Sequence, residues 1–252
     1  MDVGARYTEV ERYADLLERG IVQLVGFEQD ESQLPALNKR YPDHKFISAF
    51  IGDGSKRTFY NCYYGGCSSL YRPDPKIINQ FTSIATTEGS NFEVVSEEYV
   101  QTTKLDAIHE IEACDYLKID VQGAELDVLK GAEETLKDCL IVEAEVEFVP
   151  LYENQPLFSD VDNFVKDKGF SLVDLKRYYW KRQNNVNTGN SKGQMIFGDA
   201  LYFKSPEQIL LMPNISQEKI IRCIFIYLAY GYVDLAQTLL KNATNKELLS
   251  EE

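Results

Sequence analysis

Short apolar runs alternate with amphipathic stretches along the first fifty residues of the chain. Residues 21–27 and 44–51 are apolar runs of strand length, whereas residues 10–17 repeat apolar positions at helical spacing, with Thr8 as a candidate cap. A second helix, capped by Asp30, follows the first of these two strands. The alternation of strands and helices predicts a parallel sheet with right-handed crossovers.

The stretch from Asp115 to Ala132 carries the strongest pattern in the chain. It reads as a buried strand, a tight turn and a helix, and Asp120 stands at the carboxyl end of the strand. Gln122 and Gly123 form the turn, because glycine tolerates the backbone angles that such a reversal needs. Ligands of open α/β sheets bind outside the carboxyl ends of the strands. Asp120 and Gln122 therefore stand where a ligand should lie, although Asp120 is equally consistent with a cap of the following helix.

Residues 140–149 predict a further strand that carries an unusual row of charges. Its apolar residues alternate with Glu143, Glu145 and Glu147. A helix at residues 160–168 follows. The last two strands of the sheet are expected at residues 170–175 and 200–203, on either side of the polar stretch 183–193, for which we expect mobility.

The pattern becomes helical after Ser205, where residues 215–230 and 233–242 predict a helix pair. We therefore expect an α/β domain over residues 1–204 and a helical extension over residues 205–252. The apolar part of the extension contains Arg222 and is shorter than a membrane span requires. Its apolar face is expected to pack on the core or on a second copy of the chain, which would give a homo-oligomer.

Composition narrows the classes of function. The 252 residues are 44% hydrophobic, which is enough for one sizeable core, and the net charge of −14 argues against a nucleic-acid partner. Five cysteines without a Cys-x-x-Cys pair indicate free thiols in a reducing compartment, so we expect a cytoplasmic protein. With two histidines, no dedicated metal site is predicted. No signal peptide is visible, and the sequence leaves open whether the native chain starts upstream of Met1.

The amino-terminal residues suggest a nucleoside site. Glu28 follows the strand at 21–27 and lies 24 residues after Gly4, which matches an acidic residue that grips ribose hydroxyls. A carboxylate suits this role because it accepts two hydrogen bonds from a vicinal diol. The turn after Asp2 has one glycine and not the three of a dinucleotide fingerprint. A nucleoside without phosphates fits this better, and S-adenosylmethionine is the common one.

Several of these motifs together resemble the FkbM-type S-adenosylmethionine-dependent methyltransferases. The resemblance covers most of residues 2–203 and rests on Asp2-Val-Gly-Ala, Gly26-Phe-Glu-Gln-Asp30, Ser68-Ser-Leu70, the long run from Leu117 to Ala132, and Glu143 to Leu157. It implies a Rossmann-like methyltransferase fold, with a mostly parallel, doubly wound sheet of about seven strands and an antiparallel edge hairpin. It also implies methyl transfer, often to a hydroxyl of a sugar or natural product. The chain departs from the family at its start, where the first strand is nearly absent.

The resemblance assigns roles position by position. The cofactor-binding positions that it implies are Asp2, Gly4, Glu28, Gly52, Ser69, Asp120 and Gln122. Among them, Gly4 would contact the methionine end of the cofactor, Glu28 the ribose, and the region of Gly52 the adenine. Ser69 belongs to residues 57–72, which read as a hairpin or a lid.

For the chemistry, we expect Asp120 to act as the base that removes the proton of an acceptor hydroxyl, with Glu145 in reserve. The acceptor is expected to be a small molecule or a glycan, and a divalent ion that acidifies the hydroxyl is an alternative of lower weight. The basic and aromatic stretch 176–182 could stack on sugar rings, although a solvated hairpin explains it as well.

Two rival functions remain open at this point. A nicotinamide-dependent oxidoreductase would require a fuller glycine motif than the chain has. A non-catalytic, methyltransferase-like scaffold would instead bind a partner through the helical extension.

Overall fold

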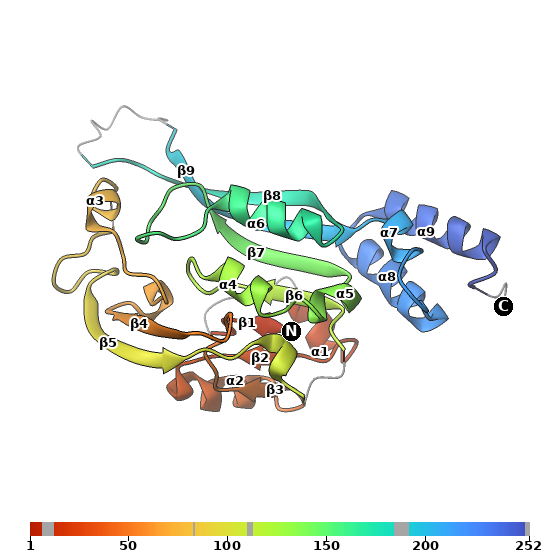
Figure 1. Cartoon of the computed structure of the whole chain (residues 1–252), viewed down its shortest axis with the longest axis horizontal. Coiled ribbons are helices and arrows are strands. Elements are labelled where there is room, and N and C mark those ends of the chain that lie inside the picture. Colours follow the sequence, from red (N-terminus) through yellow and green to blue (C-terminus); the bar gives the residue numbers. More distant parts are fainter. Residues whose placement is uncertain (7–12, 83, 110–112, 184–191, 250–252) are drawn as a thin grey trace.

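The computed structural model describes residues 1–6, 13–82, 84–109, 113–183 and 192–249 of the chain (Figure 1). The expected cap at Thr8 and most of the polar stretch 183–193 lie outside the described residues.

A seven-stranded mixed sheet forms the centre of the fold. The strands in spatial order are β3 (Lys45–Ile47), β2 (Val25–Phe27), β1 (Asp2–Val3), β6 (Tyr116–Ile119), β7 (Ile141–Glu147), β9 (Gln194–Lys204) and β8 (Phe170–Trp180). The strands from β3 to β7 pair in parallel, and β9 pairs antiparallel with both β7 and β8. The order runs outward from β1 in both directions. The expected doubly wound, Rossmann-like sheet is thus confirmed, with β8 and β9 as its edge hairpin.

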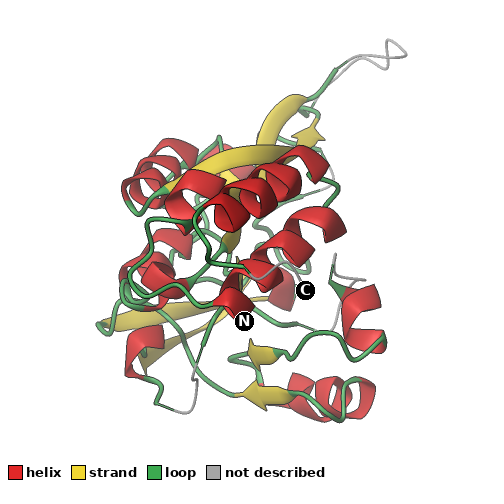
Figure 2. Ribbon diagram, turned by 90° about the vertical axis from the view of Figure 1, so that its right-hand side faces the viewer, coloured by secondary structure: helices red, strands yellow, loops and turns green. Residues whose placement is uncertain are grey.

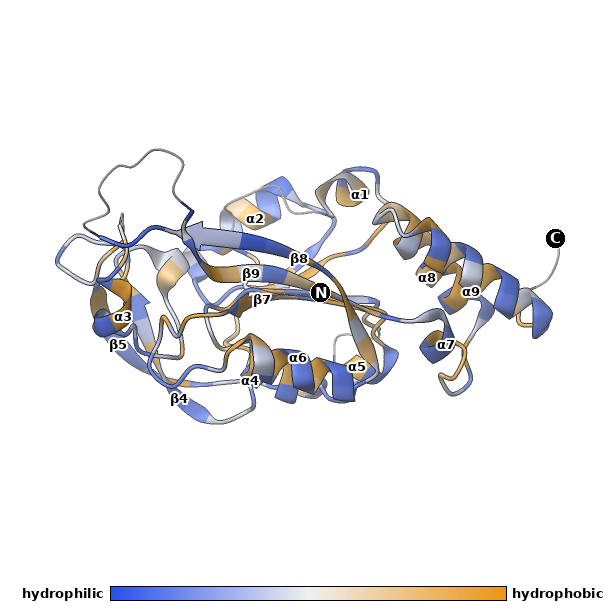
Figure 3. Ribbon diagram, turned by 90° about the horizontal axis from the view of Figure 1, so that it is seen from above, coloured by the Kyte–Doolittle hydropathy of each residue, from blue (hydrophilic) through white to orange (hydrophobic). Residues whose placement is uncertain are grey.

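Helices cover both faces of this sheet (Figures 2 and 3). One face carries α1 (Ala14–Glu18) and α2 (Leu34–Arg40), and the other carries α4 (Glu125–Lys130), α5 (Thr135–Asp138) and α6 (Phe158–Asp167). In α6, Val161 and Val165 are buried while the opposite side is polar, as an amphipathic surface helix requires. The main core therefore lies between β6, β7 and the helices of the second group.

The helix after the central strand is shorter than its apolar spacing predicts. The chain leaves α4 after Lys130 and becomes helical again only in α5. Gly131 lies at the interruption, and a β-carbon there would stand 2.0 Å from the carbonyl oxygen of Gly52. The close approach of two backbones at this point excludes a side chain.

A second, smaller sheet borders the carboxyl ends of the main strands. It pairs β4 (Lys56–Cys62) with β5 (Val94–Gln101) antiparallel, and the segment between them contains the turn of 3₁₀ helix η2 (Gly65–Cys67) and α3 (Pro75–Ile78). Residues 57–72 therefore do not form a self-contained hairpin. Their strand pairs with a segment more than thirty residues later, and only an isolated bridge between Tyr60 and Ser69 is seen within the described part of that stretch.

Strand lengths also differ from the sequence pattern. The third strand ends at Ile47, and Ile51 forms an isolated bridge with Thr103 instead. The hairpin strands β8 and β9 are both longer than expected, because they continue to pair with each other beyond the region where β9 pairs with β7. The domain also contains two further 3₁₀ turns, η1 (Glu31–Gln33) and η3 (Leu105–Ala107). Asp30 caps η1, since its side chain accepts a hydrogen bond from the Ser32 amide.

The extension forms α7 (Pro206–Ile209), α8 (Gln217–Ala229) and α9 (Val233–Asn245), and these helices pack beside the end of the sheet (Figure 1). Their apolar faces share one cluster with the sheet, which unites Leu140, Ile141, Leu201, Phe203, Ile220, Cys223, Tyr227 and Leu239. Of the two expected partners for this apolar face, the core or a second copy of the chain, the structure shows the core. Among the described helices, none is long and apolar enough to cross a bilayer.

Candidate active site

A cavity of about 420 Å³ opens at the carboxyl ends of the central strands. The ends of β1, β2 and β6 form its floor, β7 to β9 form one wall, and residues 64–70 form another. The strand order reverses between β1 and β6, and open α/β sheets bind ligands at such a point. The volume falls within the range of about 300–1,000 Å³ that is usual for small-molecule sites.

The register of the sheet brings charges from distant parts of the sequence into rows on the pocket side. In the first row, Asp2 pairs with Lys118, which in turn pairs with Glu143. The second row lies two residues further along each strand. There Asp120 comes beside Glu145, which pairs with Asp199. Four strands therefore contribute carboxylates to one surface, although no two of these strands are adjacent in the sequence except β6 and β7.

Gln122 joins the two carboxylates that the sequence nominated for catalysis. Its Nε2 donates to Asp120 Oδ1 and to Glu145 Oε1, at 2.9 Å in both cases. Its own Oε1 accepts from the hydroxyl of Tyr152 at 3.3 Å. The backbone of Gln122 has a φ of 58°, an angle that side-chain-bearing residues rarely adopt, and such strain is concentrated at functional sites. Asp120, Gln122 and Glu145 thus form a single hydrogen-bonded unit in the pocket wall.

The interpretation of Asp120 as a helix cap is wrong. The residue that precedes α4 is Ala124, and no side chain caps the helix from that position. Glu125, the first residue of α4, holds the preceding turn, because its Oε1 accepts from the amides of Val121 at 2.9 Å and Gly123 at 3.2 Å. The carboxylate of Asp120 is therefore left for the pocket.

Burial raises the pKa of both nominated carboxyls. For Asp120, the loss of solvent is the largest effect, and Lys118 and the Gln122 amide act against it. For Glu145, burial is again the largest effect, and the negative charge of Asp120 raises its pKa further, well above the ordinary value. A carboxylate with a raised pKa is a stronger base, and a pair with unequal environments can divide acid and base roles.

Two of the expected cofactor positions also line the cavity. Glu28 follows β2 and is almost completely buried, and its Oε1 accepts from the Asp30 amide at 2.8 Å. Burial is the main cause of its raised pKa. Gly4 follows β1 with a φ of +91° and lies against the backbone of Asp120. Apolar lining comes from residues 49–51 after the third strand, at the place expected for an adenine ring.

Three other expected positions lie behind the lining residues. The carboxylate of Asp2 accepts from the Tyr13 hydroxyl and pairs with Lys118 Nζ at 3.4 Å. Ser69 Oγ donates to the Gln122 carbonyl at 2.6 Å, and thereby helps to hold the turn. Gly52 packs against the Thr102 side chain, and its carbonyl oxygen occupies the space that a β-carbon of Gly131 would need. In this structure Asp2 and Ser69 support lining residues, whereas Gly52 packs closely against Thr102 and Gly131.

The sequence reasoning missed several lining residues. Lys118 interrupts an otherwise apolar strand, and this unusual position could have singled it out. Asp199 could not be found without the register of the hairpin, which places it opposite Lys176. The stretch 176–182 was interpreted either as a surface that stacks on sugar rings or as a solvated hairpin, and the structure shows residues of both kinds. Lys176 and Tyr178 line the cavity, and Tyr178 donates to Asp199 Oδ2 at 3.2 Å, while Tyr179 is exposed.

The sequence was compared with models of known protein families and with curated proteins. The model of the methyltransferase FkbM domain matches residues 2–172. No curated protein sequence matches the chain significantly.

The solved structures that the chain matches include three methyltransferases. A methyltransferase FkbM from Methylobacillus flagellatus KT is 14% identical with a TM-score of 0.42, over 80% of this chain and 42% of that chain. The chain therefore spans less than half the length of that protein. Magnesium protoporphyrin IX methyltransferase from Synechocystis PCC 6803, with bound S-adenosylmethionine, is 8% identical with a TM-score of 0.39, over 81% and 68%. A putative RNA methyltransferase from Pyrococcus horikoshii is 11% identical with a TM-score of 0.37, over 81% of this chain and 72% of that chain.

The model of the methyltransferase FkbM domain spans about two thirds of the residues of this chain. The chain therefore belongs to the FkbM methyltransferase family.

Proposed function

We propose that the protein transfers a methyl group from S-adenosylmethionine to a hydroxyl of a sugar or a natural-product-like small molecule. The observation that carries the proposal is the unit of Asp120, Gln122 and Glu145, which lies in the same cavity as Glu28. A family whose members transfer methyl groups needs a methyl donor and a means of removing the acceptor proton, and this cavity offers residues suited to both.

The donor set fits a nucleoside without phosphates. The buried carboxylate of Glu28 can accept hydrogen bonds from the ribose diol, and the apolar residues 49–51 can enclose an adenine ring. Gly4 presents backbone without a side chain at the end of β1, where the methionine part would lie. When bound, S-adenosylmethionine supplies an electrophilic methyl group on a positively charged sulfur. The carboxylates that line this cavity favour such a charge.

The residues around the unit can bind and orient a hydroxylated acceptor. Asp120 accepts the proton of the reacting hydroxyl, and Gln122 fixes the carboxylate in one orientation while it does so. Asp199, Lys176 and Tyr178 offer further polar groups on the hairpin strands next to Glu145. The ring of Tyr178 is stacked on Phe197, with centroids 4.5 Å apart, so an aromatic surface borders the same wall. Aromatic faces next to hydrogen-bonding groups are suited to sugar-like compounds.

A ligand scan followed by a transfer assay tests the proposal. Thermal unfolding is measured with S-adenosylmethionine, S-adenosylhomocysteine and NAD, because a ligand that binds only the folded state raises the melting temperature. We expect the first two to raise it and NAD to have no effect. Labelled methyl transfer to a panel of hydroxylated sugars and natural products then identifies the acceptor. Stabilisation by NAD alone would favour the oxidoreductase, and stabilisation by none of the three would favour the scaffold.

A further inference from the structure

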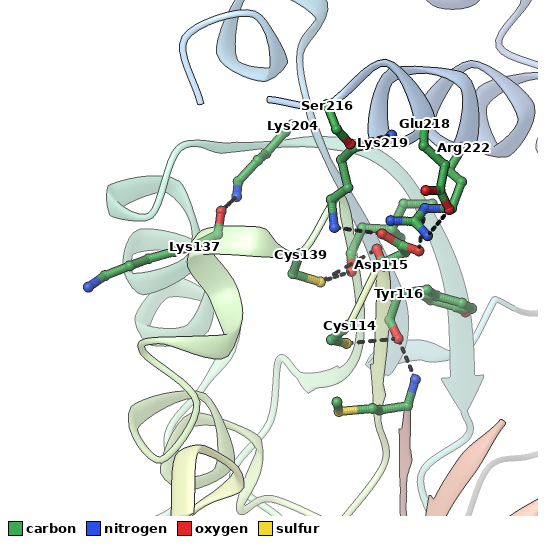
Figure 4. Close-up of polar contacts among 12 residues, drawn as sticks. Cys114, Asp115, Tyr116, Lys137, Cys139, Lys204, Ser216, Glu218, Lys219 and Arg222 are labelled. Atoms are coloured by element: carbon green, nitrogen blue, oxygen red, sulfur yellow. Dashed lines mark hydrogen bonds and ion pairs between the residues drawn. The ribbon is translucent and has the colours of Figure 1, made fainter. Parts of the chain in front are cut away.

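The helical extension is bound to the strand that carries the pocket residues, at the end of that strand farthest from the cavity. Asp115 immediately precedes β6, and its two carboxylate oxygens are both occupied by α8 (Figure 4). Lys219 Nζ lies 2.6 Å from Oδ1, and Arg222 Nε lies 3.2 Å from Oδ2. Lys219 is buried, and one partner of a buried ion pair cannot be removed cheaply. This clamp therefore fixes α8 against the start of β6.

The next residue of the strand, Tyr116, is packed between two other tyrosines. Its ring makes edge-to-face contacts with Tyr230, at a centroid distance of 6.2 Å, and with Tyr13, at 6.0 Å. Tyr230 directly follows α8 and also contacts Phe203 of β9 at 5.9 Å. Burial, together with Tyr230 and Glu143, raises the pKa of Tyr116 well above its ordinary value. The phenol therefore keeps its proton and remains a hydrogen-bond donor.

The hydroxyl of Tyr116 reaches the pocket wall. It donates to Oε2 of Glu143, a β7 residue that is almost completely buried and lines the cavity. The strand neighbour of Glu143 is Lys118, which lines the same cavity. A continuous set of contacts thus leads from α8 through Asp115 and Tyr116 to a carboxylate of the pocket.

We propose that the C-terminal extension is a positioning element of the pocket. Lys219 and Arg222 hold Asp115, Tyr230 packs on the neighbouring Tyr116, and the Tyr116 hydroxyl holds the carboxylate of Glu143 in one orientation. A fixed negative charge there favours a positively charged ligand, because the site does not have to reorganise when the ligand binds. The identity of that ligand, S-adenosylmethionine, rests on the proposed function, but the link from the extension to Glu143 does not.

The link itself is read without any ligand, from the side-chain carboxyl ¹³C resonance of Glu143 in glutamate-labelled full-length protein. Its assignment comes from the peak lost in Glu143→Gln. We expect Tyr116→Phe and Tyr230→Ala each to move this resonance, and Tyr230→Phe, which keeps the ring contact, to restore most of it. Tyr232→Ala is the matched control, because the Tyr232 ring also contacts Phe203, at 5.0 Å, and its hydroxyl donates to the Val173 carbonyl. A Glu143 resonance that stays unmoved in Tyr230→Ala, or moves as far in Tyr232→Ala, overturns the link.

The effect on the pocket is read by calorimetry with S-adenosylmethionine and S-adenosylhomocysteine. The two ligands differ by one methyl group and the positive charge on sulfur. Because a Glu143 carboxylate without this donor has to reorganise when the charged ligand binds, we expect Tyr116→Phe to weaken S-adenosylmethionine binding about tenfold, or about 1.4 kcal/mol, and S-adenosylhomocysteine binding much less. The double variant Tyr116→Phe/Tyr230→Ala should lose little more affinity for S-adenosylmethionine than Tyr116→Phe alone, since Tyr230 acts through Tyr116.

The outcomes separate the two proposals. If affinity falls equally for both ligands, or in proportion to the melting temperature of each variant, the extension only stabilises the fold. The proposal that it positions a pocket residue is then refuted. If the wild type binds neither ligand, the proposed function fails, while the Glu143 resonance still decides whether the extension reaches the pocket.

Discussion

Gly4 lies so close to Asp120 that a β-carbon at position 4 would stand 1.9 Å from the Asp120 carbonyl oxygen. The ends of β1 and β6 therefore approach each other more closely than any side chain at position 4 permits, and the catalytic candidate is placed by that approach. Sequence reasoning assigned Gly4 to the cofactor. The structure adds a second reason for glycine at this position, which is the packing of two strand ends.

Gly4→Ala should consequently be far more damaging than an ordinary glycine substitution. Gly20→Ala is the matched control, because Gly20 also has a positive φ, of +64°, but no atom lies within 4 Å of its added β-carbon. Backbone strain alone costs about 1–3 kcal/mol, and we expect Gly4→Ala to exceed the control by at least that amount in urea unfolding. Equal destabilisation of the two variants would show that β1 can move away from Asp120 without cost.

Asp120→Asn should reduce the rate of methyl transfer by about 10²–10⁴-fold, the usual contribution of a general base. The substitution keeps the size of the side chain but removes the charge that accepts the proton. The affinity for S-adenosylmethionine should change much less, because Glu28 and Gly4 are untouched. Single-turnover rates with the acceptor identified in the panel measure the effect, and Glu145→Gln serves as the comparison. A larger loss in Glu145→Gln, with Asp120→Asn near wild type, would transfer the role of base to Glu145.

Glu28→Ala should weaken S-adenosylmethionine binding by about 1.5–3 kcal/mol, because the ribose diol loses a charged acceptor. Glu28→Gln is the more informative partner variant. Its side-chain oxygen can still accept from the Asp30 amide, so the local turn is kept while the charge is lost. We expect an intermediate loss for this variant by calorimetry. Wild-type affinity in both variants would remove Glu28 from the cofactor site.

Glu125→Gln should change how stability depends on pH. Burial raises the pKa of Glu125 from 4.5 to about 8, so the folded state holds a proton that the unfolded state releases between these values. The stability that this group contributes is therefore full below pH 4.5 and is lost as the pH rises to about 8. Glutamine stays neutral and can still accept from Val121 and Gly123.

The advantage of the Glu125→Gln variant should therefore grow with pH. At about 1.4 kcal/mol for each pKa unit, we expect a gain of roughly 3–5 kcal/mol over wild type at pH 8.5 and almost none at pH 4.5. Urea unfolding at both pH values measures it. A difference between the two proteins that does not vary with pH would contradict the assignment.

Removal of residues 205–252 should expose apolar surface and cause association. Leu140, Ile141, Leu201 and Phe203 share their cluster with α8 and α9 and would face solvent without them. Size-exclusion chromatography with light scattering would report the association. A truncated chain that stays monomeric and unfolds at the wild-type temperature would instead establish residues 1–204 as an independent domain.

Much of this architecture can be read from the sequence because it follows from local pattern. The strands β6 and β7 are predictable because buried apolar residues recur at every second position in each, and the carboxyl end of β6 then nominates Asp120 directly. The hydrogen-bond partners of Asp120 are harder to predict from the sequence. The contacts of the Asp120 carboxylate depend on the turn that follows it, in which Gln122 has a positive φ that composition does not reveal.

Other features depend on pairings between distant segments. β4 and β5 have no pattern that identifies them as partners, because the chain between them is long and their faces are mixed in polarity. Asp199 and Lys176 enter the pocket only through the register of the hairpin. The contact of Tyr230 with Tyr116 depends on where α8 docks, and nothing in the helical periodicity of the extension specifies that position.

The row of glutamates in β7 makes the chemistry of this pocket sensitive to strand length as well as to residue type. Side chains alternate between the two faces of a strand, so deletion of a single residue within β7 would move the side chains that follow it to the opposite face of the sheet. Val142, Ala144 and Val146 would then turn toward the cavity, and the glutamates would be forced against the apolar layer below α4 and α6. Insertions and deletions between residues 141 and 147 should therefore be absent from every active relative.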